Sequence, residues 1–188
     1  YDDLYWMEHF GDPGYRYMTA MVEVWCRLAL RLANADILPY DFRSYAEVVG
    51  GFLDTIEKQP EVAANLDLAT ASDAVDQWRQ QAERLDRTLR THLQTGDLSP
   101  ARTAAVNKAL LQVERQFLST EGIPDRPWFK HVLFAPRYTY AAMSLPGIQE
   151  AVEVKDWDRA RQQVKLLSQR LEAAATMVKR ATDELDRL

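Results

Sequence analysis

Three histidines are the side chains of this sequence best suited to bind a metal ion. They are His9, His92 and His131, and they lie far apart in the chain. None stands in an HExxH arrangement, and none has a carboxylate at the spacing of a ligand pair. A di-iron helical bundle needs Glu-x-x-His on two helices, which this sequence does not provide. We therefore interpret the histidines as packing or surface residues and expect His131 to tie down a loop through hydrogen bonds to the backbone.

The sequence also lacks motifs for nucleophilic catalysis and for phosphate binding. Cys26 is the single cysteine, which excludes an internal disulfide and every zinc site built from several thiolates. The sequence has no GxSxG, P-loop or GxGxxG motif. Asp2, Asp3 and Glu8 could supply the two carboxylates of a hydrolytic site, but nothing in the sequence fixes their positions. We therefore interpret them as polar loop residues. No self-contained active site emerges, so the chain alone is not expected to be an enzyme.

Length and charge narrow the class of protein. The 188 residues are 47% hydrophobic and 27% charged, which is typical of one globular domain. A net charge of −5 argues against a nucleic-acid partner. No apolar run approaches the roughly 20 residues of a membrane span, and residues 1–15 do not resemble a signal peptide. Since the chain does not begin with Met, we expect it to be a piece of a longer polypeptide.

Apolar residues at spacings of three and four predict a bundle of four or five long amphipathic helices. Residues 1–14 are expected to be irregular, and residues 119–147 form one long loop rich in proline and aromatic residues. No segment alternates with a period of two, so no sheet is predicted. The expected fold class is all-α. The helices are predicted at 15–34, 42–56, 70–95, 100–117 and 156–185, with shorter ones at 60–66 and 146–154.

Two features indicate close packing of these helices. The apolar face of residues 15–34 is broader than one stripe, so this helix is either buried on two sides or shared with a partner. Gly50 and Gly51 interrupt the second helix and indicate a close helix contact or a kink.

The loop contains the most distinctive segment of the chain. Residues 122–136 read GIPDRPWFKHVLFAP and residues 144–148 read SLPGI, while YDDLYW, GDPGY and LPYD occur at 1–6, 11–15 and 38–41. These segments resemble the transferrin receptor-like dimerisation domain. This is the C-terminal helical domain of zinc peptidases of the glutamate carboxypeptidase II type, here in a bacterial-type homologue. The resemblance covers essentially the whole chain.

The resemblance implies a single domain over residues 1–188 in which residues 1–14 are the linker from an N-terminal peptidase domain. The zinc ligands and the general-base carboxylate would lie in that domain, so no cofactor is expected in this chain. The implied function is formation of a homodimer and contribution of a loop to the substrate pocket. Another interpretation is a receptor-like homologue whose peptidase site is lost. The compartment stays open, since relatives are commonly exported or membrane-tethered and the parent could be periplasmic or extracellular.

The same resemblance implies which residues meet the substrate. In the family a Lys-Tyr pair holds the terminal carboxylate of a glutamate-type substrate, and here residues 135–144 read APRYTYAAMS. Tyr140 matches the tyrosine, whereas Thr139 stands at the lysine position. Arg137 is a candidate replacement cation, because a guanidinium binds carboxylate bidentately. Alternatively Tyr138, Tyr140 and Met143 line an apolar pocket of a general aminopeptidase or carboxypeptidase.

We place the expected dimer surface on the first and last long helices and the adjoining loop, because aromatic residues and Met are enriched in interfaces. The alternative partner for these faces is the peptidase domain of the same chain. The expected interface residues are Tyr17, Met21, Trp25, Trp157 and Leu171.

Overall fold

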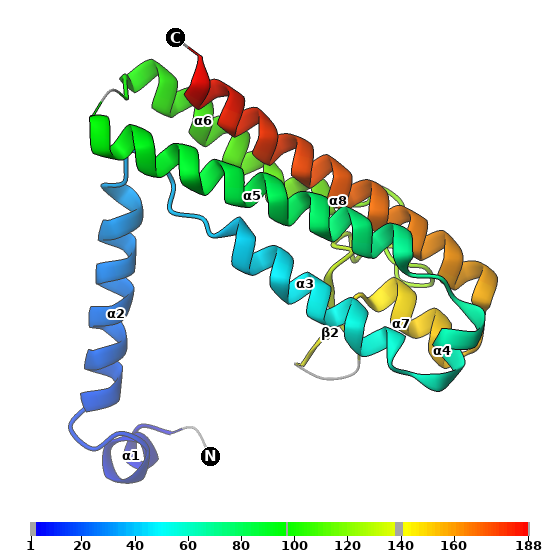
Figure 1. Cartoon of the computed structure of the whole chain (residues 1–188). Helices are drawn as coiled ribbons and strands as arrows, with labels where there is room; N and C mark the ends of the chain where they lie inside the picture. The colour runs from blue at the N-terminus through cyan, green and yellow to red at the C-terminus, as the bar shows by residue number, and fades with distance from the viewer. Residues whose placement is uncertain (1–2, 97, 138–140, 188) are drawn as a thin grey trace. The chain divides into compact units, whose positions relative to one another are not determined.

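The computed structural model describes residues 3–96, 98–137 and 141–187. The chain divides into two compact units, Tyr1–Pro39 and Tyr40–Leu188. The described residues form helices and one small two-stranded sheet, which confirms the predicted all-α class (Figure 1). The boundary between the units lies at Pro39, beyond the linker expected at 1–14. The single-domain boundaries stay a prediction.

The first unit begins with helical turns where the sequence predicted an irregular segment. Helix α1 spans Leu4–Trp6, and the π-helix η1 spans Met7–Gly11. The side chain of Asp3 starts α1, because its Oδ1 accepts a hydrogen bond of 2.7 Å from the backbone N–H of Trp6. Helix α2 follows over Arg16–Ala33, close to the predicted 15–34, and none of its residues is buried.

The second unit contains the predicted long helices with the predicted caps. Asp41 accepts a 2.9 Å hydrogen bond from the backbone N–H of Ser44 at the start of α3, and Gly96 ends α5 in a left-handed conformation. Ser99 and Asp156 cap α6 and α8. The helices are α3 Phe42–Glu57, α4 Pro60–Asn65, α5 Ala69–Thr95, α6 Pro100–Val113, the 3-10 helix η2 Glu114–Phe117, α7 Pro146–Glu153 and α8 Trp157–Asp186.

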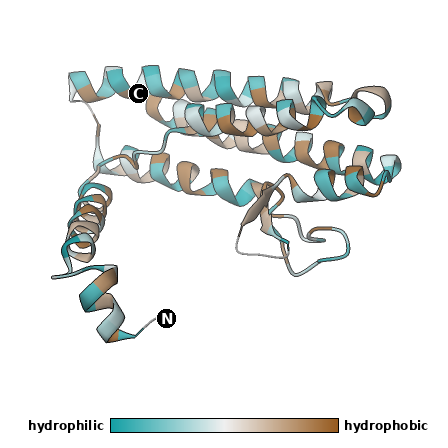
Figure 2. Cartoon of the chain, turned by 90° about the horizontal axis from the view of Figure 1, so that it is seen from below, coloured by the Kyte–Doolittle hydropathy of each residue, from teal (hydrophilic) through white to brown (hydrophobic). Residues whose placement is uncertain are grey.

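Helix α8 is the centre of the bundle. It packs against α5, α6 and α7, while α3 covers α5, and α5 and α8 lie side by side along their length (Figure 1). Hydrophobic and hydrophilic bands follow one another along these helices, as expected for amphipathic helices around one core (Figure 2). The largest fully buried side chains include Trp78 of α5, Leu110 of α6 and Leu171 of α8.

Of the two adjacent glycines of α3, Gly50 faces α5, whereas Gly51 has no atom within 4 Å of a built Cβ. The helix continues without interruption through Gly50 and Gly51. A Cβ atom built on Gly50 would lie 3.5 Å from Cγ1 of Val75 on α5, which is ordinary van der Waals contact. The expected helix contact is therefore present at Gly50 alone, and it is of ordinary length.

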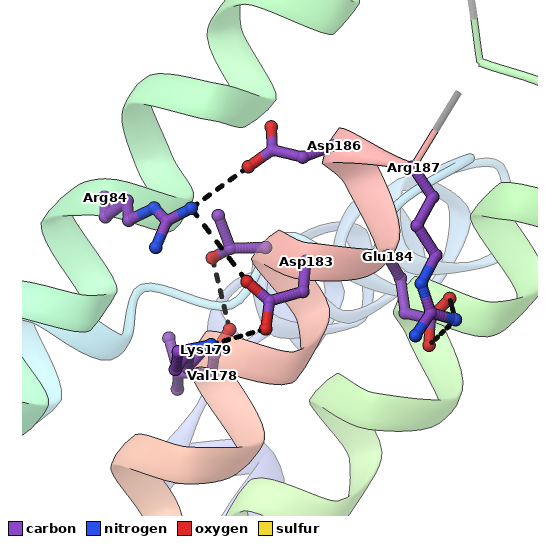
Figure 3. Close-up of polar contacts among 8 residues, drawn as sticks. Arg84, Val178, Lys179, Asp183, Glu184, Asp186 and Arg187 are labelled. Atoms are coloured by element: carbon purple, nitrogen blue, oxygen red, sulfur yellow. Dashed lines mark hydrogen bonds and ion pairs between the residues drawn. The ribbon is translucent and has the colours of Figure 1, made fainter.

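Ion pairs on the surface join α5 to the last turns of α8 (Figure 3). Nη2 of Arg84 lies 3.2 Å from Oδ2 of Asp186 and 3.9 Å from Oδ1 of Asp183. All three side chains are between 41% and 47% exposed. Pairs this open to water each contribute at most about 1 kcal/mol to stability.

The long loop contains a small antiparallel sheet that the sequence analysis did not predict. Strand β1 spans Phe134–Pro136 and pairs with β2, Ala142–Ser144, with Ala135 opposite Met143. Three residues per strand are too few to show alternation in the sequence. Among the described residues, no helix combines the length and the hydrophobicity that a membrane crossing would need.

Candidate functional site

The hairpin β1–β2 carries the segment that the sequence analysis assigned to the substrate pocket. Of the residues predicted there, Arg137 directly follows β1 and is half-buried. Tyr138, Thr139 and Tyr140 lie outside the described residues. The geometry of the site is therefore that of the hairpin base and of the side chains that hold it.

Arg126 holds the end of β1. Its Nη1 donates to the carbonyl oxygen of Pro136, and its Nη2 donates to Oε1 of Glu150 on α7. The guanidinium also lies over the ring of Phe129, 5.0 Å from the ring centroid. The side chains of Arg126 and Glu150 are only 15% and 10% exposed. This buried ion pair joins the loop, the strand that precedes Arg137 and α7.

A second ion pair joins the hairpin to the same helix. Nη1 of Arg137 donates to Oε2 of Glu153, which is half-exposed at the end of α7. Glu150 and Glu153 are three residues apart, so they lie on one face of the helix. Two carboxylates of α7 thus hold two arginines of the loop. A substrate carboxylate approaching Arg137 would compete with Glu153 for the same guanidinium.

His131 closes the base of the loop. Its Nε2 lies 2.9 Å from Oε1 of Glu114, and the backbone N–H of Leu133 donates to Nδ1 at 3.3 Å. Since Nδ1 accepts the backbone N–H of Leu133, Nε2 is the ring nitrogen that donates to Glu114. The backbone N–H of Ser119 donates to the carbonyl of Lys130 at 2.8 Å beside it. His131 thus ties down the loop as expected, but its partner outside the loop is the Glu114 carboxylate, and only its contact with Leu133 inside the loop is to the backbone.

The His131 contact connects the loop to a buried aromatic cluster. The hydroxyl of Tyr45 donates to Oε1 of Glu114 at 3.2 Å, and the rings of Tyr45, Trp78 and Phe117 have centroids between 5.1 and 5.8 Å apart. The hydrogen bond from His131, followed by that from Tyr45, lowers the pKa of Glu114. Burial and the charge of Glu114 raise the pKa of Tyr45. The carboxylate form of Glu114 is therefore favoured, because it accepts hydrogen bonds from His131 and Tyr45.

A tight turn at Gly122 sets the path of the loop. Gly122 has φ of +74°, and a Cβ atom there would lie 2.4 Å from the carbonyl oxygen of Pro127. The turn is joined to the bundle by Arg159 of α8, whose Nη2 lies 2.7 Å from Oδ2 of Asp125. Only glycine fits this backbone position without displacing a neighbouring peptide.

The predicted interface residues have three different environments. Tyr17, Met21 and Trp25 on α2 are 77%, 57% and 66% exposed, and their place in a dimer interface stays a prediction. Trp157, the first residue of α8, is half-buried. Leu171 is fully buried inside the bundle, so it belongs to the core and we do not include it in an interface.

The described part of the chain contains no group of three or more His, Cys, Asp or Glu side chains that could hold a metal ion. His9, His92 and His131 lie on η1, on α5 and in the loop. His9 Nδ1 is 2.8 Å from the backbone carbonyl of Tyr5. Cys26 is an exposed free thiol on α2.

Comparisons with known proteins identify relatives among peptidases. The chain is 28% identical to "Probable glutamate carboxypeptidase LAMP1" of Arabidopsis thaliana over 95% of its length and 27% of that protein. It is 32% identical to "Probable glutamate carboxypeptidase VP8" of Zea mays over 80% of the chain and 22% of that protein. It is 26% identical to "Aminopeptidase NAALADL1" of Rattus norvegicus over 97% of the chain and 26% of that protein.

The chain therefore spans about a quarter of the length of these curated relatives. The family model of the transferrin receptor-like dimerisation domain matches residues 66–179, which lie within the second unit and include the anchored loop. This match confirms the resemblance of the loop segments, while its bacterial type stays a prediction. The chain belongs to the transferrin receptor-like dimerisation domain family.

Proposed function

We propose that this chain serves as the dimerisation domain of a zinc-dependent exopeptidase of the glutamate carboxypeptidase type and is inactive alone. The observation that carries the proposal is the match of residues 66–179 to a dimerisation domain, together with relatives named as peptidases that are about four times as long. The zinc ion and its ligands would belong to the peptidase domain of the parent protein. This chain would hold the two copies of the parent protein together and would supply part of the substrate pocket.

The partner of the domain is a second copy of the same chain. We place the interface within residues 40–188, because the residues matched to the dimerisation family lie in this unit. Trp157 is the predicted interface residue that belongs to it. An interface of standard size would bury about 1,200–2,000 Å² and be centred on aromatic residues and Met.

The contribution to the pocket would come from Arg137, Tyr138 and Tyr140. The support for this role is the hairpin itself, because Arg126, which is paired with Glu150, donates to the carbonyl of Pro136 immediately before these residues. A pocket residue must keep its position when substrate binds, and a buried ion pair at the base provides that rigidity. Arg137 would meet a substrate carboxylate, and the tyrosines would contact the neighbouring part of the substrate.

Sedimentation velocity of the 188-residue chain tests the assembly function. We expect a dimer at micromolar concentration that dissociates on dilution. A chain that stays monomeric over this range would contradict the proposal. Zinc added to the chain should bind weakly and produce no peptidase activity.

The substrate role is tested by Tyr140→Phe in the full-length parent. Loss of the hydroxyl should raise KM or lower kcat if it contacts the substrate. The matched control is Tyr45→Phe, because Tyr45 is half-buried on α3, where its hydroxyl donates to Glu114. Unchanged kinetics in the Tyr140 variant would leave that residue with a packing role.

A second candidate function is a homologue without peptidase activity. The chain is 26% identical to "Inactive zinc metalloprotease C354.09c" of Schizosaccharomyces pombe over 92% of its length and 23% of that protein. A parent of this kind would keep the dimer and lose the catalytic zinc ligands. Peptidase and zinc assays on the purified parent distinguish the two candidates, because both would be negative for the second.

A further inference from the structure

Two aromatic rings contact Phe134, the first residue of β1. The ring of His131 stacks on that of Phe134, with 6.0 Å between the centroids and 25° between the planes. The ring of Phe52 on α3 meets Phe134 edge-on, with a centroid distance of 5.5 Å and an interplanar angle of 89°. Offset-stacked and edge-to-face pairs at such distances are the favoured arrangements of aromatic rings. The start of β1 is therefore packed against both the loop and α3.

The ring of His131 is itself held in place. Its Nε2 donates to Oε1 of Glu114 at 2.9 Å, and its Nδ1 accepts the backbone N–H of Leu133 at 3.3 Å. Its centroid lies 6.1 Å from that of Phe117, a fully buried residue of η2. A ring with a partner at each nitrogen and an aromatic neighbour has little freedom to turn. Phe134 therefore packs against a surface whose position is set by η2.

Backbone hydrogen bonds hold the main chain around His131 without the help of its side chain. The backbone N–H of Val132 donates to the carbonyl of Phe117 at 2.9 Å, and that of Leu145 donates to the carbonyl of Leu133 at 2.8 Å. The imidazole is not needed for either bond. Its own contribution is therefore to the direction in which β1 leaves the loop.

The hairpin is too short to hold this direction by itself. Its strands have three residues each, and an isolated two-stranded sheet is only marginally stable. The direction of β1 therefore depends on contacts at its two ends. Arg126 supplies one of them through its hydrogen bond to the carbonyl of Pro136. The stack of His131 on Phe134 supplies the other.

A shift of Phe134 would turn β1 about its other end and redirect Arg137. Phe134 and Pro136 are two residues apart, which is about 7 Å in an extended strand. A shift of about 2 Å at Phe134 would therefore turn the strand by about 15°. Binding sites keep their groups within about 0.5 Å and 10–20° of the productive geometry. Because Arg137 directly follows Pro136, a turn of this size is enough to displace its guanidinium from a substrate carboxylate.

From these observations we propose that His131 is a positioning residue of the substrate pocket. It acts through Phe134, whose place sets the direction of β1 and the position of Arg137, and Glu114 supports it by fixing the imidazole. The inference rests on the proposed function, since it requires the hairpin to meet the substrate in the full-length parent. The zinc ligands would lie in another domain, so a displaced hairpin should weaken substrate binding without slowing the bond cleavage.

Steady-state kinetics of the full-length parent test this role. His131→Gln removes the ring but keeps an amide that can donate to Glu114, and Phe134→Leu removes the other ring of the stack. Each variant should raise KM about fivefold or more and leave kcat within about twofold. The double variant should raise KM no further than the larger single change, because both residues act through one contact. His131→Phe restores a ring and should return KM to within about twofold of the parent value.

Val178→Ala is the control for a general loss of stability. Val178 is fully buried in α8, about 30 Å along the helix from Trp157. Its truncation should lower the Tm of the parent and leave KM unchanged. If His131→Gln and Phe134→Leu likewise lower Tm and leave KM unchanged, the stack has only a structural role and the inference is wrong. Multiplying effects on KM in the double variant would also overturn it, because the two residues would then act independently.

Hydrogen exchange in the 188-residue chain separates this inference from the proposed function, because it needs no peptidase activity. The amides of β2 should exchange about fivefold faster or more in His131→Gln and in Phe134→Leu, while those in the middle of α8 stay unchanged. Unchanged exchange in β2 would overturn the inference and leave the proposed function intact. Faster exchange with an unchanged KM in these variants and in Arg137→Gln would overturn the pocket role of the hairpin, and this inference with it.

Discussion

Arg126 and Glu150 form an ion pair in which only 15% and 10% of the two side chains are exposed, although the residues come from an irregular loop and from α7. Removing one member leaves an uncompensated buried charge, which typically costs about 3–5 kcal/mol. The guanidinium of Arg126 also donates to the carbonyl of Pro136. Loss of Arg126 should therefore release the hairpin as well as destabilise the bundle.

Arg126→Gln should accordingly lower the free energy of unfolding by about 3–5 kcal/mol in urea denaturation. The Arg126→Gln/Glu150→Gln double variant should lose less free energy of unfolding than the two single variants together, because no unpaired buried charge remains in it. Arg84→Gln is the control, because that exposed pair contributes at most about 1 kcal/mol. Equal losses for Arg126→Gln and Arg84→Gln would contradict the role of burial.

Two glycine-to-alanine substitutions should change the stability of the chain in opposite directions. Gly122→Ala meets the backbone oxygens of Pro127 and Phe129 and retains a positive φ, so it should destabilise the chain by more than about 2 kcal/mol. Gly51→Ala meets no atom within 4 Å in the middle of α3 and should stabilise the chain by about 0.5–1 kcal/mol. Thermal denaturation of both variants checks the pair. A neutral Gly122→Ala would show that the turn relaxes without cost.

Glu114 should make the stability of the chain depend on acidic pH. Its pKa is lowered below the ordinary value of 4.5 by the hydrogen bond from His131. The stabilisation is therefore present above the unfolded-state pKa and is lost as the pH falls through the lower folded-state pKa. Glu114→Gln should reduce the slope of Tm between about pH 3 and 5, whereas Glu172→Gln on the exposed face of α8 should leave it unchanged. An unchanged slope in the Glu114 variant would contradict this coupling.

The pair of Arg137 with Glu153 leads to a kinetic prediction for the full-length parent. If Arg137 binds a substrate carboxylate, Arg137→Gln should raise KM for a peptide with an acidic terminal residue roughly tenfold, the loss of one charge-assisted hydrogen bond. Glu153→Gln should lower KM for the same peptide, because it removes the competing carboxylate. Michaelis–Menten measurements with acidic and apolar peptides test both signs. An unchanged KM in both variants would mean that Arg137 and Glu153 only hold the hairpin in place and do not affect substrate binding.

The sequence was sufficient to predict the helices because their signals are local and repeated. Apolar spacing located α2, α3, α5 and α8, and the capping residues Asp41, Ser99 and Asp156 stand where the helices begin. Residues 1–14 were expected to be irregular, yet residues 4–11 form α1 and η1. Their start depends on one hydrogen bond, from the backbone N–H of Trp6 to Asp3.

The loop was predictable as a functional segment but not in its geometry. The sequence marked residues 119–147 by their prolines and aromatic residues, and it indicated that His131 ties the loop down, but not that the Glu114 carboxylate is its partner. It did not reveal the partner of Arg126, because Glu150 is 24 residues away on a helix whose position depends on the rest of the bundle. The strands β1 and β2 escaped prediction because each has only three residues.

The open ion pairs between Arg84 and the end of α8 also have a dynamic consequence. Salt weakens such pairs, so the last turn around Asp183 and Asp186 should fray more readily as the ionic strength rises. The fully buried Ala174 and Val178 lie deeper in the same helix, where opening requires the bundle to come apart. Amide hydrogens along this one helix would thus exchange through two different routes, a local one sensitive to electrolyte and a global one that is not.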